Sequence, residues 1–90
     1  MYRVVKHEYL PRRPRWMISL LLLLHPSYYG KHQTEHQAQV MLRYIRLAIY
    51  KTRLINGKKR VQLESSPNEI VIKNNYGKKY LTFNVEKTKS

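Results

Sequence analysis

The sequence contains no cysteine and no aspartate, and only five glutamates among its 90 residues. The lack of cysteine excludes disulfides, Cys-ligated zinc sites, iron–sulfur clusters and thiol chemistry. The lack of aspartate means that only a glutamate could orient the histidine of a catalytic triad. The three glycines are isolated at expected turns, so there is no Gly-rich loop to bind phosphate. We therefore predict that the protein is not an enzyme and uses no cofactor and no small-molecule substrate, with a metal-free ribonuclease built from Arg, Lys, Tyr and His as a minor alternative.

Long hydrophobic runs are also missing. The longest apolar stretch, Trp16 to Leu24, has nine residues, whereas a membrane-spanning helix needs about 20. His25-Pro26 follows it where a signal peptide would have small residues. Residues 1–24 are Arg-rich and acid-poor, as in a mitochondrial presequence, although serine is scarce. We interpret the apolar stretch as a buried core segment and expect no membrane among the partners.

Positive charge is what the sequence has in excess. Eighteen Lys and Arg residues face five Glu residues, which gives a formal net charge of +13. Such self-repulsion does not help a small domain to fold, and it is typical of proteins that bind a polyanion. Eight tyrosines accompany this charge, and tyrosine rings can stack on the unpaired bases of RNA. The composition therefore favours a nucleic acid as partner.

The first 24 residues predict two different segments. Residues 1–15 are expected to form an extended basic arm, because Pro11 and Pro14 each lack a backbone donor and restrict the preceding residue. Tyr2 and Val4 could begin an edge strand, but the alternation is short. Residues 16–24 are expected to form a short apolar helix that ends at His25-Pro26.

A long helix is the clearest predicted element. From Glu35 to about Leu54 there is no Pro or Gly, and apolar residues recur at helical spacing. Thr34 and Gln37 form a capping-box pattern at its start, and Asn56-Gly57 fits its end. The apolar side chains cover an arc of ~200° at ~100° per residue. We therefore expect this helix to be buried on most of its circumference.

The remaining sequence alternates with a period of two. Segments 60–64, 69–73 and 79–85 read as strands separated by the turns Ser65-Ser-Pro-Asn68 and Asn74-Asn-Tyr-Gly77. The predicted fold is α+β, with a short apolar helix and a long amphipathic helix packed on a three-stranded antiparallel meander. The domain would span residues 16–86, after the arm at 1–15 and before a polar tail at 87–90.

The strongest candidate site is a polar stripe on the long helix. Arg43, Arg46, Tyr50 and Arg53 fall within an arc of ~80°. Guanidinium groups bind phosphate oxygens through paired hydrogen bonds, and both Arg and Tyr can stack on bases. Three further basic residues should continue the stripe beyond the helix: Lys58, Lys59 and Arg60.

Two other basic clusters are candidates for the same interface. Arg12, Arg13 and Arg15 lie in the predicted arm, beside Trp16, which can stack on a base or anchor the arm to the core. Lys78 and Lys79 lie at the predicted tip of the second hairpin, close to Tyr76.

One pattern points to a different chemistry. His32-Gln-Thr-Glu-His36 has the H-x-x-E-H spacing of inverted zinc proteases. A zinc site also needs a third protein ligand and a substrate cleft, and His32 precedes the proposed helix cap at Thr34. We interpret the pattern as a chance match and predict no metal site.

These observations favour a non-catalytic RNA-binding subunit of a ribosome-like particle inside the cell. Mitochondrial and other organellar ribosomes belong to this class of particle. Its basic clusters would contact rRNA phosphates, and its apolar residues would hold the fold or touch neighbouring proteins. One alternative is a small virus- or plasmid-encoded DNA-binding regulator, although no helix-turn-helix spacing is present. Another is a supernumerary subunit of a membrane complex. The clusters occur towards both ends of the chain and on one helix face, which favours the structural subunit.

Overall fold

The computed structural model of the chain describes residues 1–52 and 61–88. Its elements confirm the predicted α+β class, with two helices and a single antiparallel sheet. The element bounds, in chain order, are β1 (Tyr2–Glu8), α1 (Arg15–Leu23), the 3-10 turn η1 (Pro26–Tyr29), β2 (Lys31–His32), α2 (Glu35–Lys51), β3 (Val61–Ser66), β4 (Glu69–Asn74) and β5 (Lys79–Lys87).

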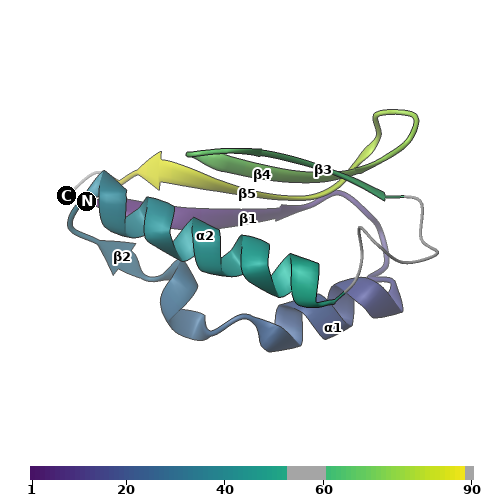
Figure 1. Cartoon of the computed structure of the whole chain (residues 1–90), viewed down its shortest axis with the longest axis horizontal. Coiled ribbons are helices and arrows are strands. Elements are labelled where there is room, and N and C mark those ends of the chain that lie inside the picture. Colours follow the sequence, from purple (N-terminus) through teal and green to yellow (C-terminus); the bar gives the residue numbers. More distant parts are fainter. Residues whose placement is uncertain (53–60, 89–90) are drawn as a thin grey trace.

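The sheet has five strands in the order β2-β1-β5-β4-β3, so the predicted three-stranded meander is too small (Figure 1). The meander itself is present as β3, β4 and β5. The additional strands, β1 and β2, come from the first 32 residues of the chain. β1 pairs with β5 along its whole length, from Tyr2 opposite Lys87 to Glu8 opposite Leu81, and β2 pairs with the start of β1.

The predicted N-terminal arm is therefore a strand followed by a turn. Backbone pairing with β5 holds residues 2–8 in the sheet, and the Tyr9 N–H still donates to the Tyr80 carbonyl at 3.1 Å. Pro11 and Pro14 lie in the segment that connects β1 to α1. Their restriction on backbone geometry thus shapes a short connection and leaves the preceding strand intact.

The two helices form close to where the sequence predicts, but the apolar stretch is not the expected buried core segment, because Ile18, Leu22 and Leu23 are exposed. The apolar stretch is helical as α1, and α2 begins at its cap residue Thr34, whose Oγ1 accepts from the Gln37 N–H at 3.2 Å. The Gln37 side chain accepts from the Gln33 N–H at 3.1 Å, one residue earlier than a capping box requires. The predicted helix end at Asn56-Gly57 lies outside the described residues.

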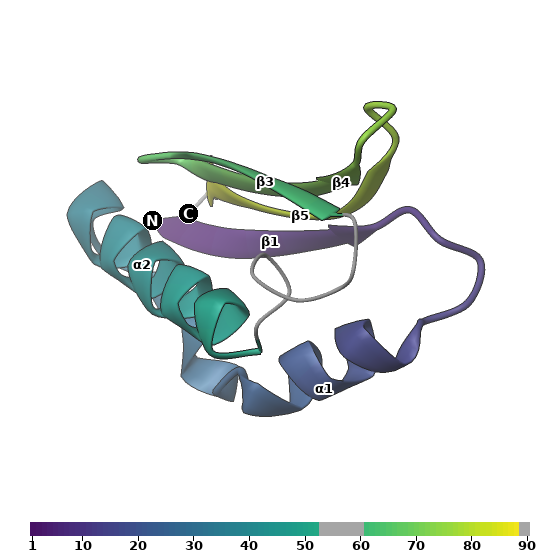
Figure 2. The ribbon, with the colours of Figure 1, turned by 45° about the vertical axis from the view of Figure 1, so that its right-hand side comes forward.

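Both helices pack on one side of the sheet (Figure 2), and the core fills the space between the layers. Side chains from every layer are fully buried there, among them Val4, Leu20, Ile45, Ile72 and Phe83. Burying each such side chain contributes about 1.5–3 kcal/mol relative to leaving it exposed.

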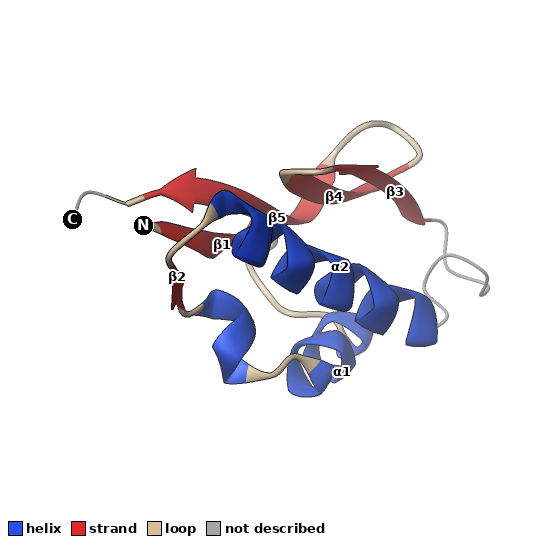
Figure 3. Ribbon diagram, turned by 60° about the vertical axis from the view of Figure 1, so that its left-hand side comes forward, coloured by secondary structure: helices blue, strands red, loops and turns tan. Residues whose placement is uncertain are grey.

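The buried stripe of α2 is narrower than its apolar arc predicts. Tyr44 is 47% exposed and Leu47 is 55% exposed. α2 contacts the sheet on one side, α1 and η1 on another, and leaves the remainder free (Figure 3). The expectation of a helix buried on most of its circumference is therefore wrong.

Candidate nucleic-acid interface

The sheet face opposite the helices carries a mixture of charges. The strand register places four basic residues there, Arg3, Lys31, Lys73 and Lys79, together with three acidic ones, Glu64, Glu69 and Glu86. Lys73 and Glu64 form an ion pair across β3 and β4. Because acidic residues are interspersed with the basic ones in nearly equal number, this face does not present the one-sided positive field that attracts a polyanion.

A fourth carboxylate, that of Glu8, is held by cations at the end of β1. Arg13 donates from Nε and Nη2 to its two oxygens at 2.7 and 2.9 Å, and Lys6 Nζ lies 3.4 Å away. The hydrogen bond from Arg13 holds the pKa of Glu8 below its ordinary value, against an opposing effect of partial burial. Arg13, predicted to bind nucleic acid, is thus occupied within the fold.

The fifth carboxylate, that of Glu35, joins α2 to the β3–β4 turn. Asn68 Nδ2 donates to Glu35 Oε1 at 3.1 Å, and Gln39 Nε2 donates to Asn68 Oδ1 at 2.7 Å. Glu35 is also the first residue of α2, where a negative charge interacts favourably with the helix dipole. This small network fixes the turn beside the helix.

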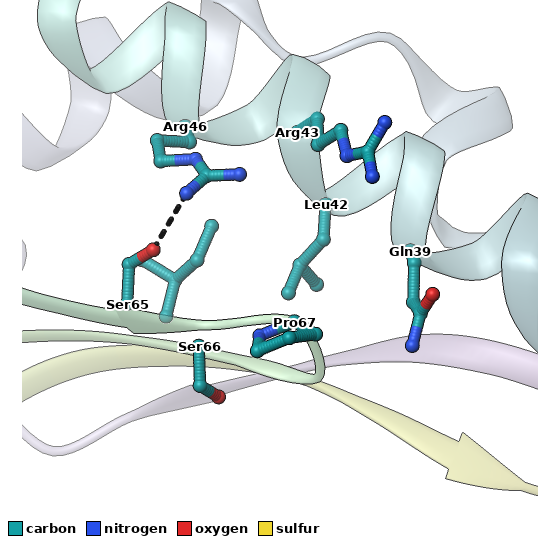
Figure 4. A pocket seen from close by; sticks show the side chains of 8 residues that line it. Gln39, Leu42, Arg43, Arg46, Ser65, Ser66 and Pro67 are labelled. Atoms are coloured by element: carbon teal, nitrogen blue, oxygen red, sulfur yellow. Dashed lines mark hydrogen bonds between the residues drawn. The ribbon is translucent and has the colours of Figure 1, made fainter.

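Next to this network, α2 and the β3–β4 turn enclose a groove of about 190 Å3. Arg43 and Arg46 project from the helix above it, while Leu42, Ile70 and Pro67 line its interior (Figure 4). Arg46 Nη1 donates to Ser65 Oγ at 2.8 Å, which fixes the guanidinium at the rim. Among the described residues, neither arginine forms an ion pair. The groove can therefore accept an anion.

The predicted stripe on α2 is thus formed in its described part. Arg43 is exposed, Arg46 is half-buried at the groove, and Tyr50 follows one turn later with 47% of its surface exposed. Arg53, Lys58, Lys59 and Arg60 lie outside the described residues.

The first basic cluster divides between binding and structural positions. Arg12 and Arg15 are exposed around the start of α1. Trp16 is partly buried against the core, and its ring lies 6.0 Å from that of Tyr80. This position fits an anchor more closely than a ring free to stack on a base.

The second cluster lies at the turn between β4 and β5. The Asn74 side chain accepts from the N–H groups of Tyr76 and Lys78, each at 2.9 Å, and Gly77 adopts a φ of 87° that favours glycine. This geometry leaves Tyr76 94% exposed, next to the exposed Lys78 and Lys79. The predicted hairpin tip with an aromatic and two cations is confirmed.

Two of the basic clusters, the one around the start of α1 and the one at the β4–β5 turn, lie at the same end of the molecule. In Figures 1 and 2 the β4–β5 turn and the beginning of α1 are both at the end away from the N-terminus. Two contacts join the start of α1 and the end of β1 to the first residues of β5. The Trp16 ring lies against the Tyr80 ring, and the Tyr9 N–H donates to the Tyr80 carbonyl. Clusters that are far apart along the chain are therefore neighbours in the fold.

The structure does not assemble the H-x-x-E-H pattern into a metal site. His32 is in β2 and His36 is in α2, while the Glu35 carboxylate is hydrogen-bonded to Asn68. Within residues 1–52 and 61–88 there is no group of three His, Cys, Asp or Glu side chains arranged to hold a metal ion.

Ser65 and the groove could not be identified from the sequence. Ser65-Ser-Pro-Asn68 reads only as a turn, and nothing local relates it to Arg46, 19 residues earlier. Comparison of the chain with known protein families, curated proteins and solved structures finds no match. In the part of the chain that the structure describes, no helix combines the length and apolarity that crossing a bilayer requires.

Proposed function

We propose that the protein is a non-catalytic RNA-binding subunit of a ribosome-like ribonucleoprotein. Organellar ribosomes, such as the mitochondrial ribosome, belong to this class of particle. The observation that carries this proposal is the separation of charge across the fold. The five carboxylates lie on the uncovered sheet face or in local networks with Arg13, Lys6 and Asn68. The exposed cations around α2, the start of α1 and the β4–β5 turn are left to meet phosphates.

Exposed apolar side chains support the second part of the proposal, contact with neighbouring proteins. Ile18, Leu22 and Leu23 of α1 are 45%, 81% and 55% exposed, and Tyr44 and Leu47 project from the adjacent α2. Phosphates do not bind such surfaces, whereas protein partners do. The same exposed apolar side chains also favour a different candidate function, that of a supernumerary subunit of a membrane complex. That candidate predicts that the protein needs detergent to stay in solution once nucleic acid is removed.

Salt dependence tests RNA binding directly. Affinity for a labelled RNA should fall as the salt concentration rises. In a plot of the logarithm of the association constant against the logarithm of salt concentration, the slope should be about −0.7 to −0.9 for each phosphate neutralised. The double variant Arg43→Ala/Arg46→Ala should bind all sequences more weakly, and the slope should become shallower by about one for each phosphate that is no longer neutralised. Fluorescence anisotropy over a series of salt concentrations measures both quantities.

The matched control is Arg3→Ala/Lys31→Ala, which removes the same charge from the uncovered sheet face. It should leave the slope nearly unchanged. A slope near zero for the wild type, or equal losses of affinity for the two double variants, would contradict the proposal. Loss of discrimination among DNA sites in the Arg43→Ala/Arg46→Ala variant would favour the DNA-binding regulator instead.

A further inference from the structure

We infer that the groove between α2 and the β3–β4 turn binds single-stranded RNA, with a backbone phosphate at Arg43 and Arg46 and the adjoining base stacked on Tyr50. This inference rests on the proposed function and specifies which form of RNA the site takes.

The dimensions of the groove favour a single phosphate with part of its sugar. Its volume of about 190 Å3 is below the range of about 300–1,000 Å3 that is usual for pockets holding a whole drug-sized ligand. Leu42 and Ile70 are buried beneath the groove, so no acidic side chain competes for the guanidinium groups from below.

Ser65 organises the site before RNA arrives. A guanidinium has five N–H donors, and Ser65 Oγ accepts from one nitrogen of Arg46. The remaining donors can bind phosphate without a search for the correct rotamer. Because Ser65 Oγ acts as an acceptor in this bond, its own proton is free to be donated to a ribose 2′-hydroxyl. Arg43 makes no side-chain hydrogen bond to any described residue and can approach from the other rim.

Tyr50 supplies the preference for single strands. It lies four residues after Arg46 on the same side of α2, about 6 Å further along the helix. Its half-exposed ring can take an unpaired base, whereas the bases of a duplex already stack on one another. Base–aromatic stacking of this kind changes affinity by about tenfold.

Anisotropy with three labelled probes tests this arrangement. They are a single-stranded RNA of about twelve nucleotides, the duplex formed with its complement, and single-stranded DNA of the same sequence. We expect the single-stranded RNA to bind about tenfold tighter than the duplex, and tighter than the DNA. Tyr50→Ala should remove about tenfold of the affinity for single-stranded RNA and leave duplex binding unchanged, while Tyr50→Phe should retain it.

Tyr44→Ala is the matched control, because Tyr44 is on the same helix and equally exposed, at 47%, but lies off the stripe. It should leave both affinities unchanged. Equal affinity for single strand and duplex, or equal losses of affinity for Tyr50→Ala and Tyr44→Ala, would overturn this inference while leaving salt-dependent RNA binding intact. If none of the probes binds in a salt-dependent way, the proposed function fails together with it.

Discussion

Among single residues, Glu8 shows how one carboxylate can hold two segments of this basic protein together. It receives two hydrogen bonds from Arg13 and lies near Lys6, so one acidic group joins the β1 strand to the turn that leads into α1. The arrangement uses one edge of the Arg13 guanidinium to hold the fold. Neighbouring Arg12 and Arg15 form no ion pair with any described residue.

The lowered pKa of Glu8 predicts a pH-dependent contribution to stability. Its carboxyl binds protons less readily in the folded state than in the unfolded state, so its contribution is complete above the ordinary pKa of 4.5 and is lost as pH falls through the lowered value. We expect Glu8→Gln to unfold at lower urea concentration than the wild type at pH 7, with the difference shrinking towards pH 3. Glu69→Gln, which removes a carboxylate that forms no ion pair with described residues, should show no such convergence. A constant difference for Glu8→Gln would contradict the assignment.

At the level of elements, α1 has one side committed to the core and one side free. Leu20 is fully buried, whereas Leu22, two residues later, is 81% exposed. Replacing leucine with alanine at each of these two positions therefore distinguishes the core side of α1 from its free side. Leu20→Ala should lower the free energy of unfolding by about 2–5 kcal/mol, and Leu22→Ala should change it by less than about 0.5 kcal/mol. Chemical denaturation measures both. Similar destabilisation at the two positions would show that α1 packs differently.

The elements that the sequence predicts correctly are those formed by nearby residues. The apolar run of α1, the N-cap and periodicity of α2, the turn at Ser65-Ser-Pro-Asn68 and the alternation in β3 to β5 are all local patterns. The full length of β1 does not follow from the sequence, because its pairing partner β5 is about 80 residues away and its own alternation of apolar and basic residues is short. Register across such a distance is set by the core, which a single segment does not reveal.

The candidate site also divides into a part that local sequence patterns predict and a part that depends on tertiary structure. The stripe of Arg43, Arg46 and Tyr50 can be predicted because helical periodicity alone places its members on one side. The bond from Arg46 to Ser65 and the capture of Arg13 by Glu8 depend on tertiary packing or on the path of a turn. Sequence periodicity therefore identifies the candidate binding residues on α2, while the groove that gives them a shape requires the fold.

Over the whole molecule, the cations are arranged along its long axis of 41 Å. The chain termini, β2 and the Glu35 network are at one end, and the basic β4–β5 turn and the start of α1 are at the other (Figure 1). The sequence alone suggests cations towards both ends of the chain. Folding brings the β4–β5 turn and the start of α1 to one end, while the groove at Arg43 and Arg46 lies along the side of α2, next to the Glu35 network. RNA should therefore contact both that end and the side of α2.

This polarity predicts which lysines RNA protects. Lys51 is exposed on α2, Lys78 and Lys79 are exposed at the basic end, and Lys31 and Lys87 are exposed at the opposite end, where both pair across from β1. Acetylation of the native protein, read by mass spectrometry with and without saturating RNA, should become several-fold slower at the first three and stay unchanged at the other two. Because all five side chains are exposed in the free protein, their reactivities provide matched internal controls. Uniform protection would show that RNA surrounds the molecule, and protection confined to Lys31 and Lys87 would reverse the proposed orientation.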